Sequence, residues 1–271
     1  MKKIVLLVLI IIPTILLSAK DKCSNAKRLN RGQYTLAHYN IGAIRKSTDS
    51  SIKTISDVLK ELRPDVISLN EVDSCAKRTK AVDQLAALAE SMGNWNPHYA
   101  AAFPFQGGAY GVGVISRPEM KIIRTDRISL PKLAGAEARA VSIVEFEDMI
   151  FASTHIDYKS VEVQKAQIEI INDYMDRIYA ASDKPIFLCG DFNFKPDSPS
   201  MQLMKETWIL LSSTELTFPS NKPAICIDYI FVRPQGCTVK VKKTCIPRSL
   251  ETADVSTASD HLPVAVTVVI K

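Results

Sequence analysis

The stretch IFLCGDFN, residues 186–193, sets a short apolar strand directly against two polar side chains, Asp191 and Asn193. A carboxylate at the end of a buried strand costs free energy unless it is paired or bound to a cation. The spacing of two residues aims both side chains to the same side of the chain. An Asx-type turn ahead of Lys195 and Pro196 is the structural alternative. The pattern favours a pair of residues that carry chemistry.

The same arrangement, an apolar strand next to a polar side chain, recurs along the chain. Groups of this kind stand at Glu71, His155, Asp228, Asp260 and His261. Several such carboxylates in one chain suggest a shared cation. Carboxylate oxygens completed by water and substrate phosphate suit Mg²⁺. Zinc is less favoured, because the chain has only four histidines and none of them are close together in sequence.

Short runs rich in β-branched residues predict strands along the whole chain. They cover residues 34–39, 66–69, 112–115, 141–146, 149–154, 186–188, 227–232, 238–241 and 264–270. Apolar residues spaced three and four apart predict helices over residues 52–62, 85–89 and 168–178. Because several strands follow one another without a helix between them, we expect mixed sheets packed face to face with helices outside.

The N-terminus has the order of a secretory signal. Lys2 and Lys3 precede an apolar run over residues 4–17, and two small residues follow it. An uncleaved membrane anchor is the alternative, although the run is short for a bilayer and Pro13 interrupts it. No long linker or repeat in the sequence marks a second domain. We expect a signal peptide over residues 1–19, an N-terminal segment over 20–32 and one domain over 33–271.

The composition sets only loose bounds on function. The 271 residues carry a net charge of +5, which is compatible with a phosphorylated substrate but specifies none. Six cysteines permit disulfides in an exported chain. Their spacing shows no paired pattern of a metal site and leaves the disulfide connectivity open.

Six short motifs, taken in order, resemble those of the endonuclease/exonuclease/phosphatase superfamily. They are HYNIG with Asn40, LNEVD with Glu71, Thr154-His155, GDFN with Asp191, IDYI with Asp228, and Ser259-Asp260-His261. One such motif is weak evidence, whereas six in the right order are specific. The resemblance spans residues 40–261. It implies an α/β fold, a four-layer α/β/β/α sandwich with two mixed, mostly antiparallel central sheets and a site at one rim.

The resemblance also implies which residues bind the metal and which act on the attacking water and the phosphate. Glu71 is expected to be the main ligand of Mg²⁺, for which Mn²⁺ can substitute, with Asn40 and Asp260 near the metal or its waters. Asp191 is expected to orient or deprotonate the attacking water, and Asn193 to donate to the phosphoryl oxygens. The structural alternatives are a surface carboxylate at Glu71 and a turn cap at Asn40.

The histidines divide into two groups. Asp228 and His261 resemble the family's pair of a carboxylate and an imidazole, in which the acid sets the tautomer of the ring. His155 is similar to the second imidazole that contacts the phosphate. His38 and His98 stand in no such motif, and we expect them to be structural.

Two further residues are weaker candidates for substrate binding. Arg139 matches a minor family feature, with an internal ion pair as the alternative. Tyr110 precedes the motif GVGVISR, in which Val112 stands where many family members have a polar residue. That departure puts a substrate contact in doubt but leaves the metal chemistry untouched.

The sequence therefore predicts an exported, periplasmic or secreted, Mg²⁺-dependent phosphoesterase. We expect nuclease-like hydrolysis of a phosphodiester by in-line attack of water, in a monomer with no obligate protein partner. The alternatives are a hydrolase of phospholipids (sphingomyelinase-like) or of sugar or inositol phosphates, and a secreted binding module that has lost catalysis.

Features that would choose among these substrates are weak in the sequence. Lys240, Lys242 and Lys243 form only a modest basic patch for a nucleic acid. An aromatic hairpin that touches a phospholipid membrane would need exposed rings, and Trp95, Phe103 and Phe105 are the candidates. The same rings could equally be packed in the core.

Overall fold

The computed structural model describes residues 32–45 and 51–271. The predicted signal peptide and nearly all of the N-terminal segment lie outside these residues. Within the described ranges, no helix is both long and apolar enough to cross a bilayer.

Two six-stranded sheets form the centre of the molecule. The first has the order β11 (Val239–Cys245), β12 (Val264–Ile270), β1 (Gln33–Asn40), β2 (Val66–Ser74), β4 (Gly108–Ser116) and β3 (Asn96–Phe105). The second has the order β5 (Ile122–Leu130), β6 (Arg139–Phe146), β7 (Ile150–His155), β8 (Ile186–Asp191), β10 (Asp228–Arg233) and β9 (Ile209–Leu210). The pairs β1–β2 and β7–β8 are parallel and the other pairs are antiparallel, which confirms the mixed sheets expected from the sequence.

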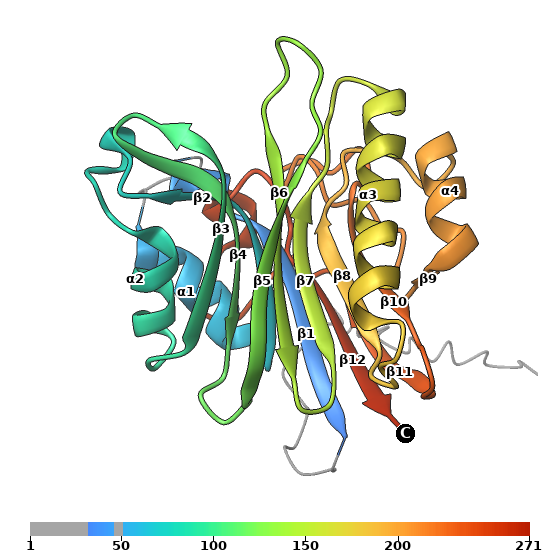
Figure 1. Ribbon diagram of the computed structural model, residues 1–271. Coiled ribbons are helices and arrows are strands. Elements are labelled where there is room, and N and C mark those ends of the chain that lie inside the picture. Colours follow the sequence, from blue (N-terminus) through green and yellow to red (C-terminus); the bar gives the residue numbers. More distant parts are fainter. Residues whose placement is uncertain (1–31, 46–50) are drawn as a thin grey trace, which may run out of the picture.

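Helices cover the outer face of each sheet and complete four layers (Figure 1). Helices α1 (Ile52–Leu62) and α2 (Gln84–Ser91) lie on the first sheet, and α3 (Val161–Tyr179) and α4 (Pro199–Thr207) on the second. Ser51 caps α1 by accepting a hydrogen bond from the Lys53 amide, and the helix ends at Arg63 in a left-handed conformation. The short elements are α5 (Val255–Ala258), η1 (Gly42–Ile44) and η2 (Lys77–Thr79).

Strands β3 and β5 escaped prediction because both lie at sheet edges. β3 contains Pro97 and Pro104, which an edge strand tolerates and a central strand does not. β5 is largely exposed and carries charged residues between its apolar ones. Trp95 is buried, so it cannot belong to an exposed aromatic hairpin.

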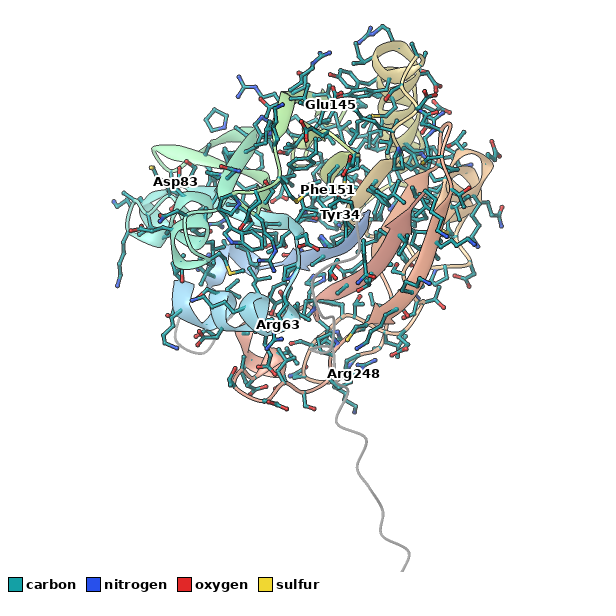
Figure 2. All side chains as sticks on the ribbon, turned by 90° about the horizontal axis from the view of Figure 1, so that it is seen from below. Tyr34, Arg63, Asp83, Glu145, Phe151 and Arg248 are labelled. Atoms are coloured by element: carbon teal, nitrogen blue, oxygen red, sulfur yellow. The ribbon has the colours of Figure 1, made fainter. Side chains whose placement is uncertain are left out.

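The topology brings the ends of four strands to one rim of the sandwich. The parallel pair β1–β2 and the parallel pair β7–β8 end side by side, with Asn40 next to Asn70 and His155 next to Asp191. The antiparallel strand β10 begins at the same rim, with Asp228 opposite Asp191. Figure 2 shows the opposite end of the molecule, where Tyr34 at the start of β1 lies.

Candidate active site

A buried amide joins the two sheets at this rim. The Nδ2 of Asn40 donates to the Oδ2 of Asp191 at 3.0 Å and to the Oε1 of Glu71 at 3.2 Å. The Oδ1 of Asn40 accepts from the Gly42 amide at 3.1 Å, so Asn40 also makes the turn cap considered as its structural alternative. Asn40 therefore holds carboxylates from β2 and β8 together across the sandwich.

A β-bulge places Glu71 in the site. The pairing of β2 with β4 shifts between Leu69 and Val72, so β2 holds one extra residue there. Glu71 takes a left-handed backbone conformation, with φ of 55°. Bulges next to active sites re-aim side chains in this way. The carboxylate consequently lines the cavity described below rather than continuing the alternation of the strand.

Asp191 stands at the centre of the cluster. Its Oδ2 lies 3.6 Å from the Nε2 of His155 and 3.6 Å from the Nε2 of His261. Its Oδ1 accepts from the Asn193 amide at 2.9 Å. Burial raises the pKa of Asp191 to about 7, against the opposing effect of the His261 charge.

Asp228 is buried between two imidazoles. Its Oδ2 lies 2.9 Å from the Nδ1 of His261, and its Oδ1 lies 3.0 Å from the Nε2 of His38. Burial acts to raise the pKa of Asp228, but the His261 charge and both hydrogen bonds hold it well below its usual range. Burial alone would lower the pKa of His261, but the charges of Asp228 and Asp191 outweigh it and raise the pKa to about 9.

His38, which we expected to be only structural, contacts this network directly. The sequence offered one signal for it, because His38 and Asn40 are two residues apart on β1 and therefore share a face. Asn70 and Thr217 are further members that the sequence did not single out. The Oδ1 of Asn70 accepts from the Asp191 amide at 2.8 Å, and the Thr217 hydroxyl donates to Asp228.

His155 has a different partner. The Nη1 of Arg139 lies 3.1 Å from its Nδ1. A guanidinium can only donate, so Nδ1 must accept and the proton of a neutral ring lies on Nε2. Burial and the charge of Arg139 hold the pKa of His155 well below its usual range. Arg139 is itself buried and also pairs with Glu137 at 3.4 Å, which is the internal ion pair considered from the sequence.

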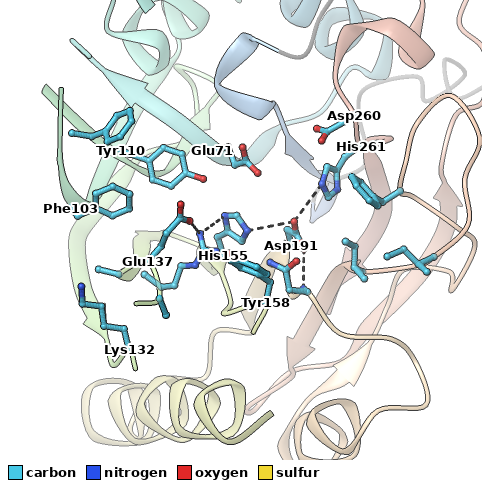
Figure 3. Close-up of a pocket in the computed structure, with 18 of the residues that line it drawn as sticks. Glu71, Phe103, Tyr110, Lys132, Glu137, His155, Tyr158, Asp191, Asp260 and His261 are labelled. Carbon is cyan, nitrogen blue, oxygen red and sulfur yellow. Dashed lines mark hydrogen bonds and ion pairs between the residues drawn. The ribbon is translucent and has the colours of Figure 1, made fainter. Parts of the chain in front are cut away.

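A cavity of about 600 Å³ opens at the cluster (Figure 3). All predicted site residues line it except Asn40 and Asp228, which are fully buried behind it. The lining residues among the predicted ones are Glu71, Tyr110, Arg139, His155, Asp191, Asn193, Asp260 and His261. Asn193 also donates through Nδ2 to the carbonyl of Ile156 at 3.0 Å, which orients its amide. The volume falls in the range of small-ligand sites, about 300–1,000 Å³.

Two groups of side chains could hold a cation. Ligand atoms of Asp191, Asp228 and His261 lie within 4.8 Å of one another. Both oxygens of Asp228 are already engaged by imidazoles, however, so a cation there would break those bonds. Glu71 and Asp260 instead line the cavity and are only partly buried. Hard oxygen ligands beside open space for water suit Mg²⁺ better.

Comparison with known proteins identifies the family and the fold. The sequence profile of the Endonuclease/Exonuclease/phosphatase family matches residues 37–261. No curated protein matches the chain. An endonuclease/exonuclease/phosphatase from Bacteroides vulgatus has a similar structure, with a TM-score of 0.70 and 18% identity over 88% of this chain and 99% of that one.

Two further solved structures share the fold. A mannosyl-6-phosphatase from Bacteroides thetaiotaomicron has a TM-score of 0.71 and 18% identity, over 87% of this chain and 99% of its own. The human Nocturnin catalytic domain, with bound sulfate, has a TM-score of 0.69 and 16% identity, over 90% of this chain and 95% of its own. At these identities the likeness establishes the fold, and the profile match establishes the family. The chain belongs to the Endonuclease/Exonuclease/phosphatase family and is a hydrolase of phosphoric ester bonds.

Proposed function

We propose that this phosphoesterase cleaves a phosphodiester, in a nuclease-like reaction, with Mg²⁺ or Mn²⁺ as its cation. The observation that carries the proposal is the position of Asp191, buried between two imidazoles and tied to Glu71 through Asn40. A carboxylate with a pKa near 7 is well matched to accept a proton from water at neutral pH.

The cation would be held by Glu71 and Asp260, with Asn40 fixing the direction of Glu71. When bound, it supplies Lewis-acid stabilisation of the charge that develops on the phosphoryl and leaving oxygens. The carboxylates present an anionic site that needs this compensation before an anionic phosphate can enter.

The remaining residues bind and orient the phosphate. Asp191 orients the attacking water and takes its proton. His261, held as an imidazolium by Asp228, offers positive charge to the phosphoryl oxygens. His155 offers an N–H from Nε2, because Arg139 occupies its Nδ1. Asn193 adds an amide donor beside Asp191.

Export is the second part of the proposal. The order of basic, apolar and small residues over residues 1–19 supports it. Cys245 is disulfide-bonded, and disulfides persist mainly in oxidising compartments. Sequencing the N-terminus of the protein from a periplasmic or secreted fraction tests it, and a chain that keeps Met1 in the cytoplasm contradicts it.

A substrate panel with and without Mg²⁺ tests the reaction. We expect hydrolysis of DNA and RNA oligonucleotides that stops with a chelator and returns when Mg²⁺ is restored. Glu71→Gln should lower kcat by about 10²-fold or more while the chain stays folded by circular dichroism. Lys271→Gln at the far end of the molecule is the control and should leave the rate unchanged. Equal rates with and without the cation contradict the proposal.

A sugar-phosphate hydrolase is the second candidate. It is favoured by the structural likeness to the Bacteroides thetaiotaomicron mannosyl-6-phosphatase. The panel separates the two, because hexose 6-phosphates would then be cleaved faster than any diester. Sphingomyelin and inositol phosphates in the same panel test the remaining alternatives.

A further inference from the structure

One end of the cavity is lined by rings. Phe103, Phe105 and Tyr110, which we call the aromatic wall, come from the hairpin of β3 and β4. The ring centres of Phe103 and Tyr110 are 5.2 Å apart, and those of Phe103 and Phe105 are 6.0 Å apart. Phe103 and Phe105 are only partly buried although their rings pack together. Apolar surface left open in a cavity commonly binds a ligand.

A second β-bulge builds this wall. The pairing of β3 with β4 shifts between Ala101 and Phe103, so Phe103 stands opposite Tyr110. Without the extra residue, Ala102 would take that position. Phe105, two residues further, then lies on the same face as Phe103. The bulge therefore brings Phe103 opposite Tyr110, and regular strand alternation adds Phe105 on the same face.

Arg78, which also lines the cavity, packs against the wall. Its guanidinium lies 4.4 Å from the ring centre of Phe105 and 5.5 Å from that of Tyr110. Its Nε and Nη2 each donate to the buried carboxylate of Asp73 at 2.7 Å. This paired contact holds the guanidinium in place, so the rings are positioned before any ligand arrives.

The wall lies beside the phosphate-binding groups. In Figure 3, Phe103 and Tyr110 lie on one side of Glu71 and His261 lies on the other. A group attached to a phosphate at Glu71 and Asp191 can therefore reach the rings. The cavity volume of about 600 Å³ leaves room for such a group next to the phosphate.

We propose that the aromatic wall is a stacking subsite for a nucleobase of the substrate, which makes a single-stranded or short nucleotide phosphodiester the substrate class. This inference rests on the proposed phosphodiesterase function. Stacked bases expose their polar edges to water and bury only their faces. The rings of the wall offer apolar ring surface, and stacking on such surface accepts any base because every base has a π-face.

The test compares a dinucleoside monophosphate carrying two adenines with the same compound carrying a base-free sugar at either position. Mg²⁺ is present throughout, and kcat/KM is measured for each. The wild type should prefer the base-bearing compound by roughly tenfold at one of the two positions, as expected for one stacked base. Phe103→Leu and Phe105→Leu keep apolar bulk but remove the ring, and each should lower this preference severalfold.

Tyr34→Leu is the matched control, because it also removes a partly buried ring but lies at the far end of the sandwich (Figure 2). It should leave the preference intact. Thermal melting of each variant reports whether it is folded. The preference is a ratio of two kcat/KM values measured on the same protein, so a smaller folded fraction does not change it.

Equal kcat/KM values for the two compounds in the wild type overturn the stacking subsite but leave the phosphodiesterase function standing. The same holds if the Phe103→Leu and Phe105→Leu variants keep the full preference. It also holds if these substitutions lower kcat/KM for a hexose phosphate more than for the dinucleoside monophosphate. Failure of the wild type to cleave either compound with Mg²⁺ overturns both proposals.

Discussion

The two imidazoles beside Asp191 have the same distance to its carboxylate but opposite electrostatic surroundings. His155 has the cation Arg139 behind it, and His261 has the anion Asp228 behind it. Burial and Arg139 hold the pKa of His155 well below its usual range. The charges of Asp228 and Asp191 overcome burial and raise the pKa of His261 to about 9. The group behind each ring thus decides its charge.

In the proposed mechanism, this difference gives the two rings different tasks at the phosphate. At neutral pH, His261 is a cation because its pKa is raised to about 9, whereas His155 is a neutral donor because its pKa is lowered well below its usual range. Asp191 must be ionised to accept a proton, and it ionises as the pH rises through about 7. Activity should therefore rise through the lower value and fall through the upper one. A bound cation lowers the first limit further by stabilising the carboxylate.

The largest effect should come from removing the carboxylate that both rings face. Asp191→Asn keeps the shape but cannot accept a proton, so kcat should fall by about 10³-fold or more. Rates at saturating substrate and Mg²⁺ measure it. Asp197→Asn, in the loop that follows Asn193, is the control and should behave as the wild type. A variant of Asp191 with less than tenfold loss excludes this residue as the base.

The next largest effect should come from Asp228, which lies behind His261 but not behind His155. Asp228→Asn removes the charge that raises the pKa of His261, so the alkaline limit of activity should move from about 9 to lower pH. The rate at neutral pH should fall by about 10²-fold. A pH profile of kcat measures both. An unchanged alkaline limit shows that His261 does not set it.

The sequence predicted the residues at the strand ends better than the residues behind them. Asp191 and Asp228 were predictable because a charge in an apolar run is costly without a partner. The partner is invisible in the sequence when it lies on another strand, as His38 does for Asp228. Such contacts depend on how the two sheets pack, which no local pattern encodes.

The strands likewise divide into those that the sequence predicted and those that it did not. Central strands such as β8 read as apolar runs, while β3 contains two prolines and three alanines and gives no such signal. Yet β3 carries the rings of the aromatic wall, and a bulge sets their register. The bulge that turns Glu71 into the cavity is equally absent from any sequence periodicity. The residues that meet at the rim could thus be named from the sequence, whereas the directions of their side chains could not.

A smaller effect should come from Arg139, which lies behind His155. Arg139→Met removes the cation behind His155 and releases its Nδ1, so the pKa of His155 should rise toward its usual range. The rate should fall by about tenfold, as for other partners that orient a site residue. Nuclear magnetic resonance titration of the imidazole measures the pKa in the absence of substrate. Arg124→Met on the exposed strand β5 is the control, and a pKa of His155 that stays low contradicts the prediction.

The smallest effect should come from His38, which touches Asp228 but lines no part of the cavity. His38→Ala leaves a buried oxygen of Asp228 without its donor, which should lower the free energy of unfolding by about 1–3 kcal/mol. The rate should fall by less than about tenfold, because the bond from Asp228 to His261 remains. His38→Gln can still donate to Asp228 and should recover part of both losses. Urea denaturation measures the free energy of unfolding of both variants, and kcat is measured on the same samples. A loss of rate as large as that of Asp228→Asn would contradict a purely supporting role and would place His38 in the chemistry itself.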